Sequence, residues 1–167
     1  RRRPLPPFAR QTFDAWWRSR GGGGASSAFG TTRGVESPPA PRVVLFADTF
    51  MRYNYPEIGR AAVTLLEGLG YEVVVPEVTC CGRPMISKGL LATARTHAEA
   101  NVRRLLPYAL AGIPIVGCEP SCILTFRDEV PDLLPGEDTR QLAEHTFLID
   151  EFLYSHVQKY GWAPGER

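Results

Sequence analysis

The chain has 167 residues, which is enough for one globular domain with a hydrophobic core and some additional segments. Its 19 basic and 18 acidic residues give a net charge of +1, but residues 1–34 hold seven arginines against one aspartate, or +6, which leaves −5 for the rest. The acidic body would repel phosphate and disfavours nucleic-acid binding, and no apolar run is long enough to span a membrane or resembles a signal peptide.

The ends of the chain and its few cysteines indicate where the protein works. The sequence begins at Arg1 without a methionine, so we expect it to be part of a longer protein. Without a secretion signal, we expect a cytoplasmic, reducing location, with attachment to a membrane only through partners. The four cysteines are then expected to be ligands or reactive thiols rather than structural disulfides.

The first 41 residues have a composition unlike the rest. Residues 1–20 contain a short helical pattern that places Phe13, Trp16 and Trp17 on one face. So small a helix cannot bury two tryptophans by itself, so we expect it to dock on a domain upstream and to leave both largely exposed in this chain. Residues 21–41 are rich in Gly, Ser and Pro, which predicts a flexible linker.

Residues 42–158 alternate between strand and helix patterns. Strands are predicted over 42–47, 71–75 and 113–117, and helices over 56–70, from a cap at Ser87 to about 111, from Pro120 onward, and over 139–158. The apolar stripe of the first of these helices is expected to consist of Ile58, Ala61, Ala62, Leu65 and Leu69. The order predicts an α/β fold, a three-layer open parallel sheet built from β-α-β-α-β units, with an N-terminal helix and flexible linker.

Unusual residues follow each predicted strand. Asp48 follows the first, Cys80 and Cys81 the second, and Cys118, Glu119 and Cys122 the third. Because ligands bind in open α/β sheets at the carboxyl ends of the strands, we expect these residues to converge on one edge.

Two adjacent cysteines beside a second cysteine pair favour a metal or cluster site. Thiolates are soft ligands suited to zinc and to iron–sulfur clusters. Gly82 would let the backbone approach that site or adopt positive φ. The alternatives are that the cysteines are small buried side chains, and that Asp48 and Glu119 are helix caps or solvated loop residues rather than oxygen ligands.

The stretches "CCGRPMISKGLL", "IPIVGCEPSC" and "TFRDE" resemble the cysteine-rich CCG domain of iron–sulfur oxidoreductases. This family includes the heterodisulfide reductase B subunit, the glycolate oxidase iron–sulfur subunit and the lactate utilisation proteins. The resemblance is strongest to the C-terminal part of fused FAD-linked oxidase and iron–sulfur-binding proteins. It implies that residues 42–158 are the first of two CCG repeats and that residues 159–167 lead to the second.

The family pattern is a cysteine, then Cys-Cys-Gly, then Cys-x-x-Cys, and this chain departs from it. Asp48 precedes Cys80 with 31 residues between the two, and it stands in the place of the first cysteine of the pattern. Glu119 stands in the place of the first cysteine of Cys-x-x-Cys, next to Cys118. The resemblance therefore implies the cofactor-binding residues Cys80, Cys81, Cys122, Cys118 and Gly82, with Asp48 and Glu119 as further metal ligands.

The resemblance implies an iron–sulfur-binding electron-transfer module of an FAD-linked 2-hydroxy-acid dehydrogenase of the lactate or glycolate type. Its cofactor would be a 4Fe-4S cluster or zinc, with FAD-binding and ferredoxin-like domains or subunits as partners. No G-x-G-x-x-G follows the first strand, so the flavin and its catalytic site would lie outside this chain. Two alternatives stay open: a zinc-binding structural and docking domain without electron transfer, and a thiol–disulfide redox module.

Overall fold

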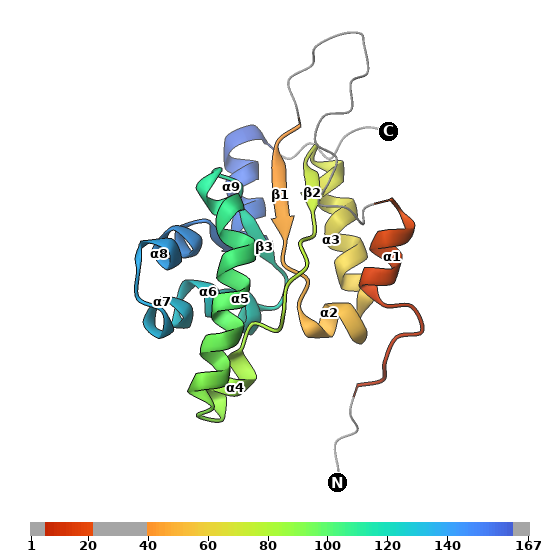
Figure 1. The fold of residues 1–167 in the computed structure, drawn as a ribbon. Helices are drawn as coiled ribbons and strands as arrows, with labels where there is room; N and C mark the ends of the chain where they lie inside the picture. Colours follow the sequence, from red (N-terminus) through yellow and green to blue (C-terminus); the bar gives the residue numbers. More distant parts are fainter. Residues whose placement is uncertain (1–5, 22–39, 162–167) are drawn as a thin grey trace.

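The computed structural model describes residues 6–21 and 40–161 and has a parallel sheet of four strands at its centre (Figure 1). The strands are β1 (Arg42–Leu45), β2 (Glu72–Val74), β3 (Ile115–Gly117) and β4 (Thr146–Leu148), in the spatial order β2-β1-β3-β4. Helices cover both faces, so the predicted α/β class and open parallel sheet are confirmed. The predicted linker and C-terminal tail lie almost wholly outside the described residues.

The alternation of side chains along the strands divides the core into two layers. Val43 and Leu45 of β1 face one layer and Val44 faces the other, as the period of two along a strand requires. In register, Val44 pairs with Ile115 of β3, and Val116 pairs with Phe147 of β4. Successive residues of β1 and of β3 therefore point into opposite layers of the core.

The helices divide between the two layers. The layer that the Val44 side chain faces contains α5 (Leu91–Leu110), α6 (Pro120–Arg127), α7 (Glu129–Leu133) and α8 (Glu137–Glu144). The opposite layer contains α1 (Phe13–Ser19), α2 (Thr49–Tyr53), α3 (Pro56–Gly68) and α9 (Ile149–Tyr160). The short α4 (Arg83–Ser87) precedes α5 and contacts it. No helix in the described ranges is long and apolar enough to cross a membrane.

Two predicted helix boundaries were wrong. The segment 139–158 is not one helix, because Thr146–Leu148 pairs in parallel with β3 and separates α8 from α9. The side chain of Glu151 accepts a hydrogen bond from the Leu148 amide and so begins α9. Ser87 does not cap the long helix: it ends α4, and Gly89 at φ +72° allows a turn before α5.

The predicted apolar stripe of α3 was partly wrong. Ile58 is 45% exposed and Ala61 is also exposed, whereas Ala62 is buried as predicted. The buried face instead includes Gly59, where an added Cβ would lie 2.6 Å from the Phe13 ring. The helix is rotated from the expected orientation because this glycine lets α1 pack closely against it.

The N-terminal helix packs on the domain itself. Phe13 is fully buried beside α2 and α3, and Trp16 and Trp17 pack around it. The expectation that both tryptophans would be largely exposed is wrong, since both are half-buried. Docking of the outer surface of this helix on another domain stays a prediction.

Candidate functional site

Three of the four thiols meet at the carboxyl edge of the sheet. Cys80 and Cys81 lie in the loop between β2 and α4, and Cys122 lies in the first turn of α6. The Cys81 sulfur lies within hydrogen-bond range of the thiols of Cys122 and Cys80 and beside the Thr125 side chain, whose hydroxyl donates to the Ser121 carbonyl oxygen at 2.8 Å. We call Cys80, Cys81 and Cys122 the thiol group; all three belong to the layer that contains α5 and α6.

Hydrogen bonding makes Cys81 the most acidic thiol of this group. The hydrogen bond from Cys122, supported by the Arg83 amide, lowers the pKa of Cys81 to about 7, although its 2% exposure opposes ionisation. The pKa of Cys122 is raised, because it donates to Cys81 and because burial and the neighbouring anions disfavour a second negative charge. Cys81 therefore ionises before Cys122, and the thiolate is the form of a cysteine that binds metals.

A buried asparagine holds the cysteine loop. Asn101 of α5 has no exposed surface, and its Oδ1 accepts from the Thr79 amide at 2.9 Å. Its Nδ2 donates to the Cys80 carbonyl oxygen at 3.1 Å. Because one side chain satisfies both a donor and an acceptor of the loop, α5 fixes the position of Cys80 and its neighbour.

Two glycines allow the chain to bend around the thiols. Gly82 has φ +92°, a conformation that other residues rarely adopt, directly between Cys81 and α4. Gly117 lies under α6, where an added Cβ would be 2.7 Å from the Cβ of Ile123. Without that close approach, α6 and its Cys122 would be displaced from the end of β3.

The remaining predicted residues lie on the opposite face of the edge. Cys118 follows Val116 at the period of two and belongs to the layer that contains α3. Asp48 caps α2, and its Oδ1 accepts from the amides of Phe50 and Met51 at 2.8 and 3.1 Å. Glu119 caps α6, and its Oε1 accepts from the amide of Ser121. We call Asp48, Cys118 and Glu119 the acid group.

Burial sets the protonation of the acid group. It raises the pKa of Asp48, against the opposing effect of its two capping amides, and the charge of Glu119 raises it further. Burial, together with the charge of Asp48, raises the pKa of Cys118 to about 11. Cys118 is therefore a neutral thiol near neutral pH, unlike Cys81.

The six expected ligands thus fall into two groups at one edge. Across residues 6–21 and 40–161, no three His, Cys, Asp or Glu side chains are arranged so that they could hold a single metal ion. A structural zinc site takes four protein ligands around one ion, one more than the thiol group supplies. In an iron–sulfur cluster each thiolate binds its own iron, so the donors of the thiol group, all sulfur, fit such a cluster better.

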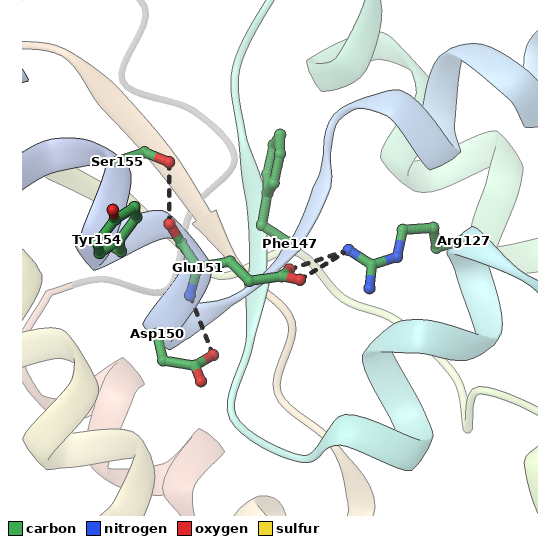
Figure 2. Close-up of a pocket in the computed structure, with 6 residues that line it drawn as sticks. All are labelled: Arg127, Phe147, Asp150, Glu151, Tyr154 and Ser155. Atoms are coloured by element: carbon green, nitrogen blue, oxygen red, sulfur yellow. Dashed lines mark hydrogen bonds and ion pairs between the residues drawn. The ribbon is translucent and has the colours of Figure 1, made fainter. Parts of the chain in front are cut away.

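A cavity of about 500 Å³ lies between the end of α6 and the first turns of α9 (Figure 2). Its polar groups bind one another: Arg127 pairs with Glu151 at 2.9 Å, and the Ser155 hydroxyl donates to the Glu151 carbonyl oxygen. The cavity offers no thiol or histidine, since its lining is Arg127, Phe147, Asp150, Glu151, Tyr154 and Ser155. We therefore place the candidate site at the carboxyl edge.

Sequence reasoning missed three residues that position the site. Asn101, Thr125 and Arg52 all bind the loops, and Arg52 donates to the carbonyl oxygens of Ala47 and Val78. Asn101 was detectable, because it interrupts an apolar helix face that includes Ala98 and Leu105. No such pattern marks Arg52, whose partners follow two separate strands.

Comparison with known proteins identifies the family. Residues 44–127 match the model of the CCG cysteine-rich domain family, a range that contains all four cysteines. The chain is 28% identical to an anaerobic glycerol-3-phosphate dehydrogenase subunit of Escherichia coli K12, over 95% of this chain and 37% of that protein. It is 32% identical to lactate utilization protein A of Geobacillus thermodenitrificans, over 67% of this chain and 47% of that protein.

A third relative is named for a different substrate. The D-2-hydroxyglutarate dehydrogenase of Pseudomonas putida is 32% identical over 56% of this chain, which corresponds to 10% of that protein. No solved structure matches. The chain spans less than half the length of these relatives. The family match covers half of the chain and all four cysteines, and this protein belongs to the cysteine-rich CCG domain family.

Proposed function

We propose that this chain binds an iron–sulfur cluster through Cys80, Cys81 and Cys122 and transfers electrons within a larger dehydrogenase. The observation that carries the proposal is the meeting of three thiols, two from the loop after β2 and one from the first turn of α6, at the carboxyl edge of the sheet. When bound, an iron–sulfur cluster supplies one-electron transfer. Two of the named relatives are a dehydrogenase subunit and a dehydrogenase, which supports the same role.

The residues around the thiol group have defined tasks in this proposal. Asn101 holds the loop that presents Cys80, and Gly82 lets the chain turn away from Cys81. The Arg83 amide donates to the Cys81 sulfur. Hydrogen bonds to ligand sulfurs are one of the factors that set cluster potential, so this donor would tune it.

We further propose a 4Fe-4S cluster and a 2-hydroxy-acid substrate oxidised on FAD elsewhere in the assembly. Lactate and 2-hydroxyglutarate, which two of the relatives are named for, are both 2-hydroxy acids. The FAD-binding and ferredoxin-like parts would then be separate domains or subunits. The relatives are longer than the segment that this chain matches, which leaves room for such parts in them.

One observation supports a second candidate, a thiol–disulfide module. Cys81, whose pKa is lowered to about 7, contacts the thiol of Cys122, the arrangement of a pair that can close a disulfide. Closing it from one thiolate and one thiol would transfer two electrons to an oxidant, such as the disulfide of a partner, and release one proton. Counting free thiols before and after mild oxidation, with no metal present, tests this candidate separately.

The proposed function is tested by purifying the protein without oxygen and measuring iron, acid-labile sulfide and zinc per chain. We expect iron and sulfide in comparable amounts, a brown colour, and an EPR signal that changes on reduction. Stoichiometric zinc without sulfide would instead establish the zinc-binding structural alternative. A metal-free protein with a Cys81–Cys122 disulfide would establish the second candidate.

A further inference from the structure

A cavity of about 350 Å³ lies on the acid-group side of the carboxyl edge. Asp48, Cys118 and Glu119 supply its polar lining. Its other lining residues are apolar or aromatic, namely Pro6, Phe50, Met51, Tyr55 and Ile58. A largely apolar hollow with a few convergent polar groups is typical of a binding site.

The two carboxylates in this cavity have no cation beside them. In the part of the chain that the structure describes, neither Asp48 nor Glu119 lies within ion-pair distance of a Lys, Arg or His side chain. Six other carboxylates there are paired with arginine, namely Asp14, Glu67, Glu72, Glu129, Glu137 and Glu151. Asp48 is only 5% exposed, and a buried carboxylate without an opposite charge is costly.

Each carboxylate also keeps one oxygen available. The capping amides bind Oδ1 of Asp48, and Ser121 binds Oε1 of Glu119. Within the described residues, no hydrogen bond reaches Oδ2 of Asp48 or Oε2 of Glu119. The two free oxygens can therefore accept from a donor that enters the cavity.

The mouth of the cavity is an exposed aromatic surface. Phe50, Tyr55 and Ile58 are 49%, 39% and 45% exposed, although large apolar side chains are usually buried. The exposed surface continues through Tyr53, whose carbonyl oxygen accepts from the Ala9 amide at 2.7 Å, beside the 81% exposed Phe8. Such a surface extends beyond what a small molecule in the cavity would cover.

We propose that this face docks a polypeptide partner that inserts an arginine side chain into the cavity. Its guanidinium would bind the free oxygens of Asp48 and Glu119, and its stem would lie against the apolar walls. Arginine fits better than lysine, because its planar fork donates to two acceptors and its stem packs on aromatic rings. Aromatic residues around a buried arginine are typical of the energetic centre of a protein–protein interface. The inference goes beyond the proposed function and does not depend on a cluster.

The test measures binding of short peptides to the whole chain by calorimetry. The probe is acetyl-Ala-Leu-Arg-Leu-Ala-amide, and its control replaces the arginine with citrulline, which has the same shape without the charge. We expect the arginine peptide to bind at least about tenfold more tightly. The difference should disappear in the double variant Asp48→Asn, Glu119→Gln, which keeps both helix caps because amides also accept hydrogen bonds.

A matched variant and two rival ligands complete the experiment. The variant Asp132→Asn, Asp138→Asn removes two negative charges elsewhere and should leave the preference for arginine unchanged. Equal binding of both peptides would overturn the proposal. Agmatine, a free guanidine without flanking residues, should bind more weakly than the peptide, and equal binding would overturn the polypeptide as occupant. A tenfold gain in peptide affinity on changing Arg1, Arg2 and Arg3 to Gln would also overturn it, by identifying the chain's own arginines as competitors.

Discussion

The thiol group and the acid group occupy the same edge of the sheet but opposite faces of it, and they have opposite chemistry. On one face the Cys81 sulfur contacts the sulfurs of Cys80 and Cys122, and hydrogen bonds lower its pKa. On the other, burial holds Cys118 as a neutral thiol beside carboxylates that cap helices. The strand order brings the loops together at one edge, where the period of two along β3 separates Cys118 from the thiol group, and Asp48 and Glu119 join Cys118 as the caps of α2 and α6.

Gly117 supports both groups, so its substitution should have the largest effect. The variant Gly117→Ala places a Cβ 2.7 Å from the Cβ of Ile123 and should cost about 1–3 kcal/mol in the free energy of unfolding. Chemical denaturation measures this loss. Gly68→Ala is the control, because nothing lies within 4 Å of its added Cβ. Equal stability of the two variants would show that α6 does not pack on Gly117.

Substitution of Asn101 should affect the thiol group and leave the acid group unchanged, because Asn101 binds only the cysteine loop. The variant Asn101→Ala leaves the Thr79 amide and the Cys80 carbonyl oxygen without a partner, a cost of about 1–3 kcal/mol. We expect lower iron content with unchanged binding of the arginine peptide. Thr96→Ala on the exposed side of α5 is the control, and an iron content as low in that variant would contradict the role of Asn101.

Substituting Gly82 and Gly89 in turn compares backbone strain next to the thiol group with the same strain elsewhere. Gly82→Ala and Gly89→Ala both place an alanine at positive φ, which should cost about 1–2 kcal/mol in each case. Only the first lies next to Cys81, so only Gly82→Ala should lower the iron bound per folded chain. Metal analysis of both variants decides this, and equal losses would mean that general destabilisation explains the effect.

The Arg127–Glu151 pair belongs to neither group and should have the smallest effect. The Leu148 amide and Arg127 lower the pKa of Glu151 below its unfolded value, so its contribution is present near neutral pH and is lost as the pH falls through the folded pKa. Because the pair is exposed, Glu151→Gln should cost less than about 1 kcal/mol at neutral pH. Denaturation at several pH values should show the difference vanishing in acid, and a constant difference would contradict this role.

The fold and the location of the site were predictable from the sequence, and the division of the site was not. Strand patterns near residues 42–47 and 113–117 indicated a parallel sheet, and the residues after them indicated its carboxyl edge. The short β4 was missed because its pattern merges with those of α8 and α9, and only pairing with β3 reveals it. The separation of Cys118 from Cys122 depends on where β3 ends, and sequence patterns locate such boundaries only approximately.

The most direct test of the account compares Cys81→Ser with Cys118→Ser in protein purified without oxygen, by iron and sulfide analysis and EPR. Both variants remove one sulfur from the same edge, so they differ mainly in which group they change. The account predicts that Cys81→Ser abolishes the cluster, whereas Cys118→Ser keeps its iron, its sulfide and its EPR signal. Loss of the cluster in Cys118→Ser to the same extent would contradict the account, because the two groups would then form one site.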